Sequence, residues 1–336
     1  MAKRECPRRG HDSVEKEVLG ILRRAVGEYV SGGIMSRRLG VSRAAVWKAV
    51  ESLRKKEFRI GSRPNLGYIL VHGPRHIVGL DIETGLGVSA IGKSVVSFDS
   101  VSSTIDVAAS FARNGSPEGT VVVAESQTGG RGRLGRRWSS PAGCGIWCSI
   151  ILKPAVSPRD APKLTLLIAV AVARVLSEEY RINARIKWPN DVVVRKRKIC
   201  GALTELVAEQ DAIRYVIASF GLNVNQSPCM FPPELAETAT SMRIEKGRRL
   251  DRPEVLRSVL REFDAEYAQF RNDGGVRILE EWRGLSCTLG KRVRVELREE
   301  RVEGVAKDIG GDGSLIVETR GGALRSVAYG DVTLLR

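Results

Sequence analysis

The segment from Gly130 to Trp138 combines residue types that suit the binding of an anion. It holds four arginines and three glycines and ends on a tryptophan. Arginine presents a planar fork of N–H donors that matches phosphate oxygens, and glycine lets the backbone adopt positive φ and approach a ligand closely. Runs of arginine and glycine also occur in nucleic-acid-binding tails. This run lies instead between two strand-like segments, 120–124 and 144–152, so we expect a long loop that binds or covers a ligand.

Polar residues also follow two later strand-like segments. The run 184–187 ends on Lys187, and Pro189 cannot continue the hydrogen-bond ladder of a strand, so we expect the Lys187 ammonium at a strand end. A fixed cation suits the attack of a carboxylate on a phosphate, which gathers negative charge in a site that must exclude water. The run 215–220 is followed closely by Asn223. A surface lysine and a turn asparagine are the plainer interpretations of these two residues.

Four motifs occur in order through the middle of the chain. They are Gln-Thr-Gly-Gly-Arg-Gly-Arg at 127–133 with Trp138, Lys-Trp-Pro-Asn-Asp at 187–191, Lys-Ile-Cys-Gly at 198–201 and Gly-Leu-Asn-Val-Asn at 221–225. Together they resemble the signatures of biotin protein ligases, over residues from about 98 to 225. The resemblance implies a two-step reaction. Biotin and ATP form biotinyl-5′-AMP and pyrophosphate, and the biotinyl group then passes to a lysine of the biotin carboxyl carrier domain of acetyl-CoA carboxylase or a related carboxylase.

The resemblance also implies roles for individual residues. Catalysis would rest on Lys187, which bridges the biotin carboxylate and the α-phosphate, and on Arg131 and Arg133, which fold over the adenylate. Biotin would contact Ser103, Thr104, Gln127, Gly130, Arg131, Lys187 and Gly201. ATP or the adenylate would contact Arg131, Arg133, Trp138, Lys187, Asn190 and Asn223.

Some of these assignments have alternatives. Ser103 and Thr104 also suit the N-cap of a helix over 105–113, and the chain has Ile105 where the family usually has Asn. Arg136 and Arg137 either join the loop over the adenylate or are solvated. Mg²⁺ is expected with ATP, and Asp191, the acid within a motif, is its candidate ligand. No Gly-x-x-x-x-Gly-Lys-Ser/Thr loop occurs to hold the phosphates.

The first 73 residues carry a large part of the positive charge. They contain sixteen Lys and Arg against seven Asp and Glu, a net +9 of the chain's +15, which favours a nucleic-acid partner. Apolar residues at helical spacing predict a helix over 14–26, and a second short helix over 34–39 is followed by Gly40 as a turn. Ser42 then caps a third helix that runs to about Lys56, and 58–70 reads as a hairpin.

This pattern predicts a winged helix-turn-helix, similar to that of BirA-type bifunctional biotin ligases, which repress biotin-synthesis genes. The resemblance implies a homodimer on operator DNA. The expected DNA contacts are Arg37, Arg38, Ser42, Arg43, Trp47 and Lys48. The alternative is a docking module whose basic face serves only solubility.

The expected fold class is α+β in three domains. A disordered basic start over 1–13 precedes a winged helix-turn-helix over 14–73 and a central mixed α/β biotin ligase domain over 74–285. Short strands within 292–327 resemble the SH3-like β-barrel at the C-terminus of biotin ligases. The resemblance implies that 286–336 form this domain. The ending 331–336 resembles the family's ending with one extra residue, so a contact of Arg336 with the nucleotide stays open.

Composition excludes several other classes. The six cysteines form no paired Cys-x-x-Cys pattern with histidines, so we expect no zinc, and Cys144 and Cys148 are expected to pack as small apolar residues. No apolar run approaches the ~20 residues of a membrane span and the start is polar, so a cytoplasmic protein is expected. A regulator that senses biotin or its adenylate with little ligase activity remains an alternative. A lipoate ligase shares the fold class but would not be expected to carry the pattern at 130–138.

The segment 192–198 is the candidate docking surface for the carrier domain. Its three valines suit a strand, and the basic residues that follow would attract an acidic partner. We therefore expect docking by pairing along a strand edge. The alternative is an ordinary hairpin with a charged turn.

Overall fold

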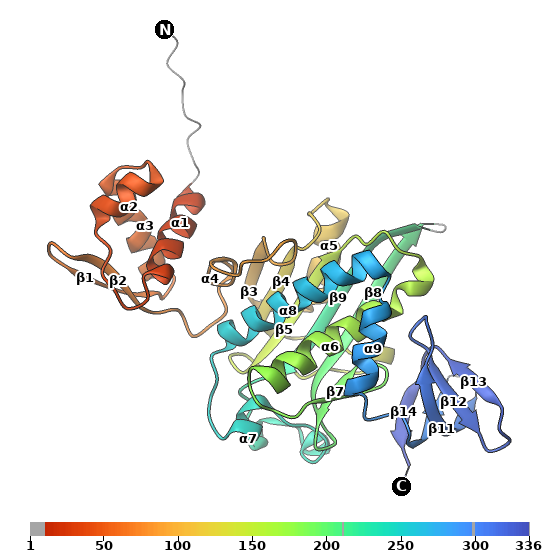
Figure 1. Cartoon of the computed structure of the whole chain (residues 1–336). Coiled ribbons are helices and arrows are strands. Elements are labelled where there is room, and N and C mark those ends of the chain that lie inside the picture. Colours follow the sequence, from red (N-terminus) through yellow and green to blue (C-terminus); the bar gives the residue numbers. More distant parts are fainter. Residues whose placement is uncertain (1–10, 210–211, 298–299, 336) are drawn as a thin grey trace. The chain divides into compact units, whose positions relative to one another are not determined.

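The computed structural model describes residues 11–209, 212–297 and 300–335. They form two compact units, the first ending at Leu86 and the second beginning at Gly87. Figure 1 shows the elements of each unit. Of the expected disordered start, residues 1–10 lie outside the described part, and the first helix begins at His11. Within the described ranges, no helix has the length and apolar character needed to span a membrane.

The first unit is a helix-turn-helix followed by a hairpin, as predicted. Ser31 and Ser42 cap the second and third helices, because their hydroxyl oxygens accept from Ile34 N and Ala45 N at 3.1 Å. Gly40 ends the second helix with φ of 66°, which favours glycine. The elements are α1 (His11–Arg24), α2 (Gly32–Leu39), α3 (Arg43–Lys55), β1 (Arg59–Arg63), β2 (Gly67–His72) and α4 (Gly79–Glu83).

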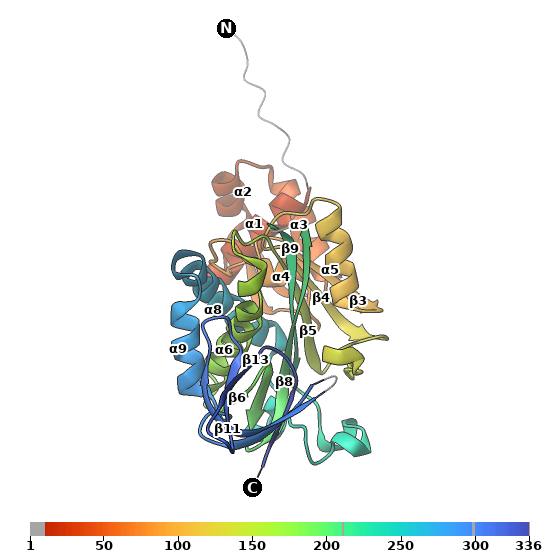
Figure 2. The ribbon, with the colours of Figure 1, turned by 90° about the vertical axis from the view of Figure 1, so that its right-hand side faces the viewer.

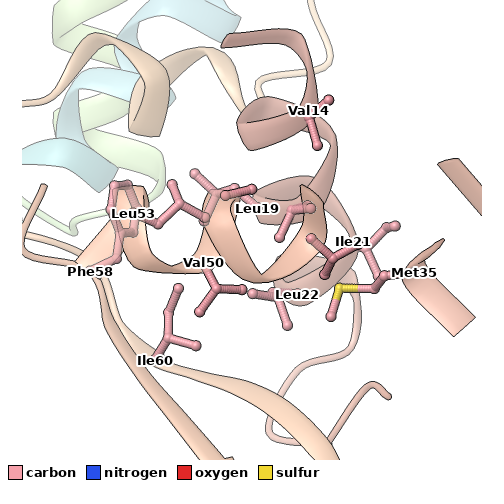
Figure 3. Packing of buried hydrophobic residues seen from close by; sticks show 12 residues of the cluster. Val14, Leu19, Ile21, Leu22, Met35, Val50, Leu53, Phe58 and Ile60 are labelled. Atoms are coloured by element: carbon pink, nitrogen blue, oxygen red, sulfur yellow. The ribbon is translucent and has the colours of Figure 1, made fainter. Parts of the chain in front are cut away.

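The core of this unit comes from the apolar residues that the helical spacing singled out. Leu19 and Leu22 of α1 are buried in one cluster with Val50 and Leu53 of α3, and Ile60 of the hairpin lies beside Val50 in the same cluster (Figure 3). The charged faces of α2 and α3 are therefore left at the surface.

The short helix α4 belongs to the first unit. Arg23 of α1 forms an ion pair with Asp81, and Lys16 Nζ lies 2.6 Å from Glu83 Oε2. These contacts fasten α4 to α1, so the compact unit extends past residue 73, where the sequence suggested that the head ends. The boundaries of the functional domains themselves stay predictions.

A seven-stranded sheet organises the second unit, in the order β3-β4-β5-β9-β8-β7-β6. β3 and β4 are parallel, and every other neighbouring pair is antiparallel. The predicted long loop, 128–144, does connect two buried strands, β4 and β5. The strands are β3 (Val95–Val101), β4 (Val121–Gln127), β5 (Gly145–Leu152), β6 (Arg185–Lys187), β7 (Asp191–Val194), β8 (Arg197–Glu209) and β9 (Ala212–Asn223).

Helices lie on both faces of this sheet (Figure 2). α6 (Pro162–Glu178), α8 (Arg252–Asp273) and α9 (Val276–Leu285) lie on one face, and α6 is apolar nearly all round because it lies between the sheet and the other two. α5 (Thr104–Arg113) packs on the opposite face, where its Ala108 meets Ile217 of β9. The short helix α7 (Met242–Lys246) follows β9.

Arg174 of α6 neutralises several carboxylates that α8 and α9 bring together. Its guanidinium lies within 3.2 Å of Glu178, Glu262, Glu266 and Glu281. Burial raises the pKa of Glu262 and of Glu266, although Arg174 opposes both shifts. Removal of the cation leaves these carboxylates facing one another.

We expect Arg174→Ala to lower the free energy of unfolding at pH 7 by about 2 kcal/mol, less than for a fully buried pair because Arg174 is partly exposed. When the pKa of a carboxyl is higher in the folded than in the unfolded state, protonation stabilises the folded protein at low pH. This contribution to the free energy of unfolding is lost as the pH rises through the folded-state pKa. The deficit should therefore shrink as the pH falls from 7 towards 5. Urea unfolding at both pH values measures it. Arg271→Ala, an exposed arginine of α8, is the control, and a deficit independent of pH would contradict the explanation.

The C-terminal strands form a separate five-stranded antiparallel sheet, in the order β13-β12-β11-β10-β14. β13 and β14 are its outer strands, and no pairing between described residues joins them, so barrel closure is not confirmed. Trp188 ties this sheet to the main one, because its backbone N–H donates to Thr288 Oγ1 at 2.9 Å and its Nε1 to Gly313 O at 3.1 Å. The strands are β10 (Arg292–Glu296), β11 (Arg301–Ile309), β12 (Leu315–Thr319), β13 (Leu324–Val327) and β14 (Asp331–Leu334). Arg336 lies outside the described residues.

The prediction of edge pairing at 192–198 is wrong. β7 pairs with β6 on one side and with β8 on the other, and its three valines are buried. Arg195 and Lys196 form the turn to β8, with φ of 50° and 71°. The segment is the hairpin with a charged turn that the sequence left as the alternative, and β3 and β6 are the outer strands.

Candidate active site

A cavity of about 450 Å³ lies on the α5 face of the main sheet. Side chains alternate along a strand, so Ser219, Gly221 and Asn223 share the face on which Ile217 meets α5. The arginine-glycine loop, the strands β6 to β9 and the segment after β9 all contribute to the lining. The loop that the sequence singled out therefore borders a ligand-sized space.

Four motif residues form a row across the floor of the cavity. Strand register pairs Lys187 with Asp191, Asp191 with Gly201, and Gly201 with Gly221. Paired residues of antiparallel strands point to the same face, and neighbouring strands lie about 4.8 Å apart. The sheet thus gathers motifs that are up to 34 positions apart in the sequence.

Lys187 supplies an ammonium that forms no ion pair within the described part of the chain. It lines the cavity from the end of β6, and among the described residues no Asp or Glu lies within ion-pair distance. The following residue, Trp188, is buried and held by Thr288, which fixes the chain at this point. The predicted position at a strand end is confirmed.

Arg131 lines the cavity but is held by two carboxylates. Its guanidinium lies 2.8 Å from Asp106 Oδ1 and 3.0 Å from Glu205 Oε1. The hydrogen bond with Glu205 contributes most to raising the pKa of Arg131. The arginine is therefore positioned by α5 and β8, two contacts that the sequence did not predict.

Arg133 and Arg136 join the loop to the C-terminal sheet. Arg133 Nη1 donates to Gly330 O at 3.3 Å and to Asn190 Oδ1 at 3.4 Å, and burial lowers the pKa of this arginine. Arg136 forms an ion pair with Asp331, so it is not merely solvated. Arg137 is exposed. Nothing in the local sequence around Gly330 and Asp331 indicated these contacts.

Trp138 lies over the paired glycines of β8 and β9. A Cβ atom at Gly221 would lie 2.5 Å from Trp138 Nε1, and one at Gly201 would lie 3.0 Å from the same ring. Lys198 Nζ lies 5.1 Å from the ring centroid, within the range of a cation–π contact. The two glycines are thus needed to seat the ring, which explains a glycine in each motif.

Hydroxyl and amide groups form a chain at one end of the cavity. Gln127 Oε1 accepts from Thr104 N at 2.8 Å and from Thr104 Oγ1 at 3.1 Å, and Gln127 Nε2 donates to Ser140 Oγ at 2.8 Å. Ser149 Oγ links Thr104 to Ser219 by two bonds of 2.9 Å. The sequence predicted Thr104 and Gln127 but missed the three serines, although hydroxyls within otherwise apolar strands were a possible signal.

Two residues predicted to contact biotin, Ser103 and Gly130, are buried next to the Thr104 end of the cavity and do not line it. Ser103 is 1% exposed and caps α5, where its Oγ accepts from Ile105 N at 3.3 Å, and it does not line the cavity. Gly130 is buried, and a Cβ there would lie 2.7 Å from Ser140 Oγ. Both residues support the lining rather than form it.

Amide side chains mark the other end of the cavity. Asn223 Nδ2 donates to Thr240 O and Gln226 Nε2 donates to Asn223 Oδ1, both at 3.0 Å. Asn190, at the corner after β6, donates to Ala202 O at 2.5 Å. Ser219 and Asn223 are four residues apart on β9, which places the two polar ends about 13 Å apart. The cavity is shaped for an elongated ligand with hydrogen-bonding groups at both ends.

Asp191 is the motif carboxylate that lines the cavity and could bind a metal ion. Asp191 Oδ1 lies 2.6 Å from Lys198 Nζ, and the described residues contain no group of three His, Cys, Asp or Glu side chains placed as metal ligands. Mg²⁺ is commonly held by one or two carboxylates, waters and the phosphates of a nucleotide. A second carboxylate of the lining, Asp331, pairs with Arg136, so a triphosphate would have to supply most of the oxygens around the ion.

The first unit presents a second candidate interface. The six side chains predicted to contact DNA are all exposed, on α2, at the cap of α3 and along α3; they are Arg37, Arg38, Ser42, Arg43, Trp47 and Lys48. Arg63 of the hairpin lies 5.5 Å from the Tyr29 ring. This surface combines exposed arginine and lysine at the start of α3, where a recognition helix contacts base edges, with the exposed ring of Trp47.

Comparison with known proteins supports both parts of the chain. The family models that match are the biotin/lipoate A/B protein ligase family over 97–225, an HTH domain over 15–69 and the biotin protein ligase C-terminal domain over 288–335. A crystal structure of the biotin protein ligase from Aquifex aeolicus in complex with biotin and ATP is similar to this fold. It has 29% identity and a TM-score of 0.63, and the match covers 73% of this chain and 99% of that one.

Two relatives resemble the chain over nearly its whole length. The bifunctional ligase/repressor BirA of Bacillus subtilis is 37% identical, over 96% of this chain and 99% of that protein. The protein of the same description from Escherichia coli is 30% identical, over 92% and 94% of the two chains. The chain belongs to the biotin protein ligase family, among the BirA-type bifunctional ligase/repressors.

Proposed function

We propose that the cavity binds biotin and ATP, forms biotinyl-5′-AMP and then biotinylates a carrier domain. The observation that carries this proposal is the convergence of the unpaired Lys187, the arginine-glycine loop and two separated polar ends on one cavity. Biotin has a ureido ring that both donates and accepts hydrogen bonds, and Thr104 and Gln127 suit it. The adenine then lies towards Asn223, with Trp138 between the two ends.

The first step joins the biotin carboxylate to the α-phosphate of ATP. A carboxylate oxygen attacks phosphorus, the bond to the β-phosphate oxygen breaks, and pyrophosphate leaves with the electron pair. Lys187 and Arg133 offset the negative charge that the reacting groups bring together, which lowers the barrier. Mg²⁺ supplies further charge on the phosphates when it is bound, with Asp191 as the candidate protein ligand.

The second step transfers the biotinyl group to the carrier. The uncharged ε-amine of the carrier lysine attacks the acyl carbon, the bond to the phosphate oxygen breaks, AMP leaves, and the nitrogen loses a proton. Until then the loop must keep water from the mixed anhydride. The contacts of Arg133 with Gly330 and of Arg136 with Asp331 hold the loop across the cavity. The carrier domain of acetyl-CoA carboxylase or a related carboxylase is the proposed acceptor.

One labelling experiment tests this function. Incubation with [α-³²P]ATP and biotin should yield labelled biotinyl-AMP, and addition of a biotin carboxyl carrier domain should convert it to labelled AMP and biotinylated carrier. Lipoate in place of biotin is the control for substrate class. Tight binding of biotinyl-AMP without turnover on the carrier would indicate a sensing regulator instead, and activity with lipoate alone would indicate a lipoate ligase.

We further propose that the first unit binds an inverted-repeat operator as a homodimer. The exposed basic residues of α2 and α3 support DNA binding, and two recognition helices would read half-sites separated by whole or near-whole turns of DNA. Biotinyl-AMP would tighten operator binding if it favours the dimer, because a ligand that stabilises the dimer raises the population that binds DNA.

Arg43→Ala should weaken operator binding by about tenfold per head, because one base-edge contact is worth about 1–3 kcal/mol, and should leave adenylate formation unchanged. Arg43 is exposed at the start of α3 in the first unit, whereas the residues that line the cavity belong to the second. Gel-shift titration with and without biotin and ATP measures the effect. Arg24→Ala, an exposed arginine in the last turn of α1, is the matched control. Binding without sequence preference by the parent protein would remove the repressor half of the proposal.

A further inference from the structure

Gln226 carries a carbonyl oxygen that has neither a hydrogen-bond partner nor contact with solvent. The residue lies just after β9, lines the cavity and is 2% exposed. Its Nε2 donates to Asn223 Oδ1 at 3.0 Å, whereas its Oε1 is buried without a partner among the described residues. Native proteins rarely keep such an acceptor unless a ligand or an ordered water satisfies it.

The neighbouring chain holds the backbone of this residue in place. Ser241 Oγ donates to the backbone oxygen of Gln226 at 2.7 Å. The preceding Asn225 exchanges hydrogen bonds of 2.8 and 2.9 Å with the backbone of Leu250, and Asn223 is held by Thr240. The segment 240–250 therefore fixes the chain at Asn223 and Gln226. Among the described residues the Gln226 carboxamide is hydrogen-bonded only to Asn223, so a rotation of this side chain can turn its Oε1 towards the cavity when a ligand arrives.

We propose that Gln226 recognises the 6-amino group of adenine and, with Asn223, selects ATP among the nucleoside triphosphates. This inference rests on the proposed binding of ATP at the Asn223 end. An exocyclic amine has two N–H donors. Asn223 Oδ1 accepts one bond from Gln226 and keeps a second lone pair, and Gln226 Oε1 keeps both of its own. The two carbonyls together satisfy both N–H groups.

The same pair of acceptors excludes purines with an oxygen at C6. Guanine and hypoxanthine would place a third carbonyl oxygen against these two, with no hydrogen between them. A site built to receive a donor rejects an analogue that lacks it, because its own buried groups stay unpaired. Gln226 therefore determines which nucleobase is bound and does not contribute to the attack on the α-phosphate.

The test compares ATP with purine riboside triphosphate, which lacks the 6-amino group. Pyrophosphate release in the presence of biotin gives kcat/KM for each nucleotide. The parent protein should prefer ATP by about tenfold or more, and Gln226→Met should lose about five- to tenfold with ATP while its value with the analogue stays unchanged. Gln226→Asn, which keeps a shorter amide, should fall between the two. Ser227→Ala, which changes the next residue outside the cavity lining, is the matched control.

The outcomes separate the possible roles. An equal loss with both nucleotides in Gln226→Met would mean that Gln226 only positions Asn223, and would overturn the inference. An unchanged preference for ATP in Gln226→Met and Gln226→Asn would overturn it as well. Failure of the parent protein to release pyrophosphate with ATP and biotin would instead overturn the proposed function on which the inference rests.

Discussion

Lys187→Ala should fold as the parent does and lose adenylate formation by about 100-fold or more, the usual cost of removing one positioned electrostatic group from a transition state. Lys187 lines the cavity without a carboxylate partner among the described residues, so its charge is available to the reacting groups. Its removal leaves no buried carboxylate behind, and stability should change little. Pyrophosphate release with saturating biotin and ATP measures the loss.

The effect should appear in kcat with KM nearly unchanged, because the loss of an interaction made only in the transition state lowers kcat and kcat/KM equally. Lys93→Ala, an exposed lysine of the same unit outside the cavity lining, should behave as the parent. Near-parental pyrophosphate release by Lys187→Ala would contradict the role assigned to Lys187. A loss confined to KM would mean that Lys187 binds substrate and transition state equally.

Arg133→Gly should release biotinyl-AMP about 10- to 100-fold faster than the parent, since hydrogen bonds to charged groups contribute about 1.5–3 kcal/mol each. In the structure this arginine holds the loop to Gly330 and Asn190. The freed intermediate would react with exposed amines, so self-biotinylation and labelling of bystander proteins should rise. The dissociation rate of radiolabelled biotinyl-AMP gives the direct measurement.

Two further variants sharpen this experiment. Asp331→Ala should also speed release, although less, because it removes only the carboxylate that holds Arg136. Arg195→Gly is the matched control, because this exposed arginine has a positive φ that glycine adopts readily and lies outside the cavity lining. Retention of the adenylate by Arg133→Gly as tight as in the parent would show that Arg133 does not hold the loop closed.

Much of the fold follows from patterns within short segments. The first three helices, α1 to α3, were predicted to within a few residues, because apolar spacing, the Ser42 cap and the Gly40 turn act within one or two turns of chain, whereas α4 was not predicted. The strands on either side of the arginine-glycine loop were predicted for the same reason. Four of the five C-terminal strands, β10 to β13, were predicted as well, because turns rich in glycine and aspartate separate them, whereas β14 was not.

The segment 192–198 shows where local pattern misled. Three valines followed by basic residues suit an edge strand, but whether a strand lies at an edge depends on what pairs with it. β6, only three residues long, covers β7 and leaves no free edge there. The sequence predicted a strand at 184–187, but a strand so short carries too little pattern to show which strand it pairs with.

The sequence by itself determined the chemistry of the site. It supplied the types and order of Lys187, Arg131, Arg133 and Asn223, because motif residues carry their chemical groups wherever the chain places them. Only the tertiary structure decided which groups act together. The register of β6 to β9 put Lys187, Asp191, Gly201 and Gly221 in one row, and the packing of β14 brought Asp331 to the loop. Such contacts join residues up to 195 positions apart, and no pattern within a short segment specifies a partner at that distance, because the packing of the whole unit selects it.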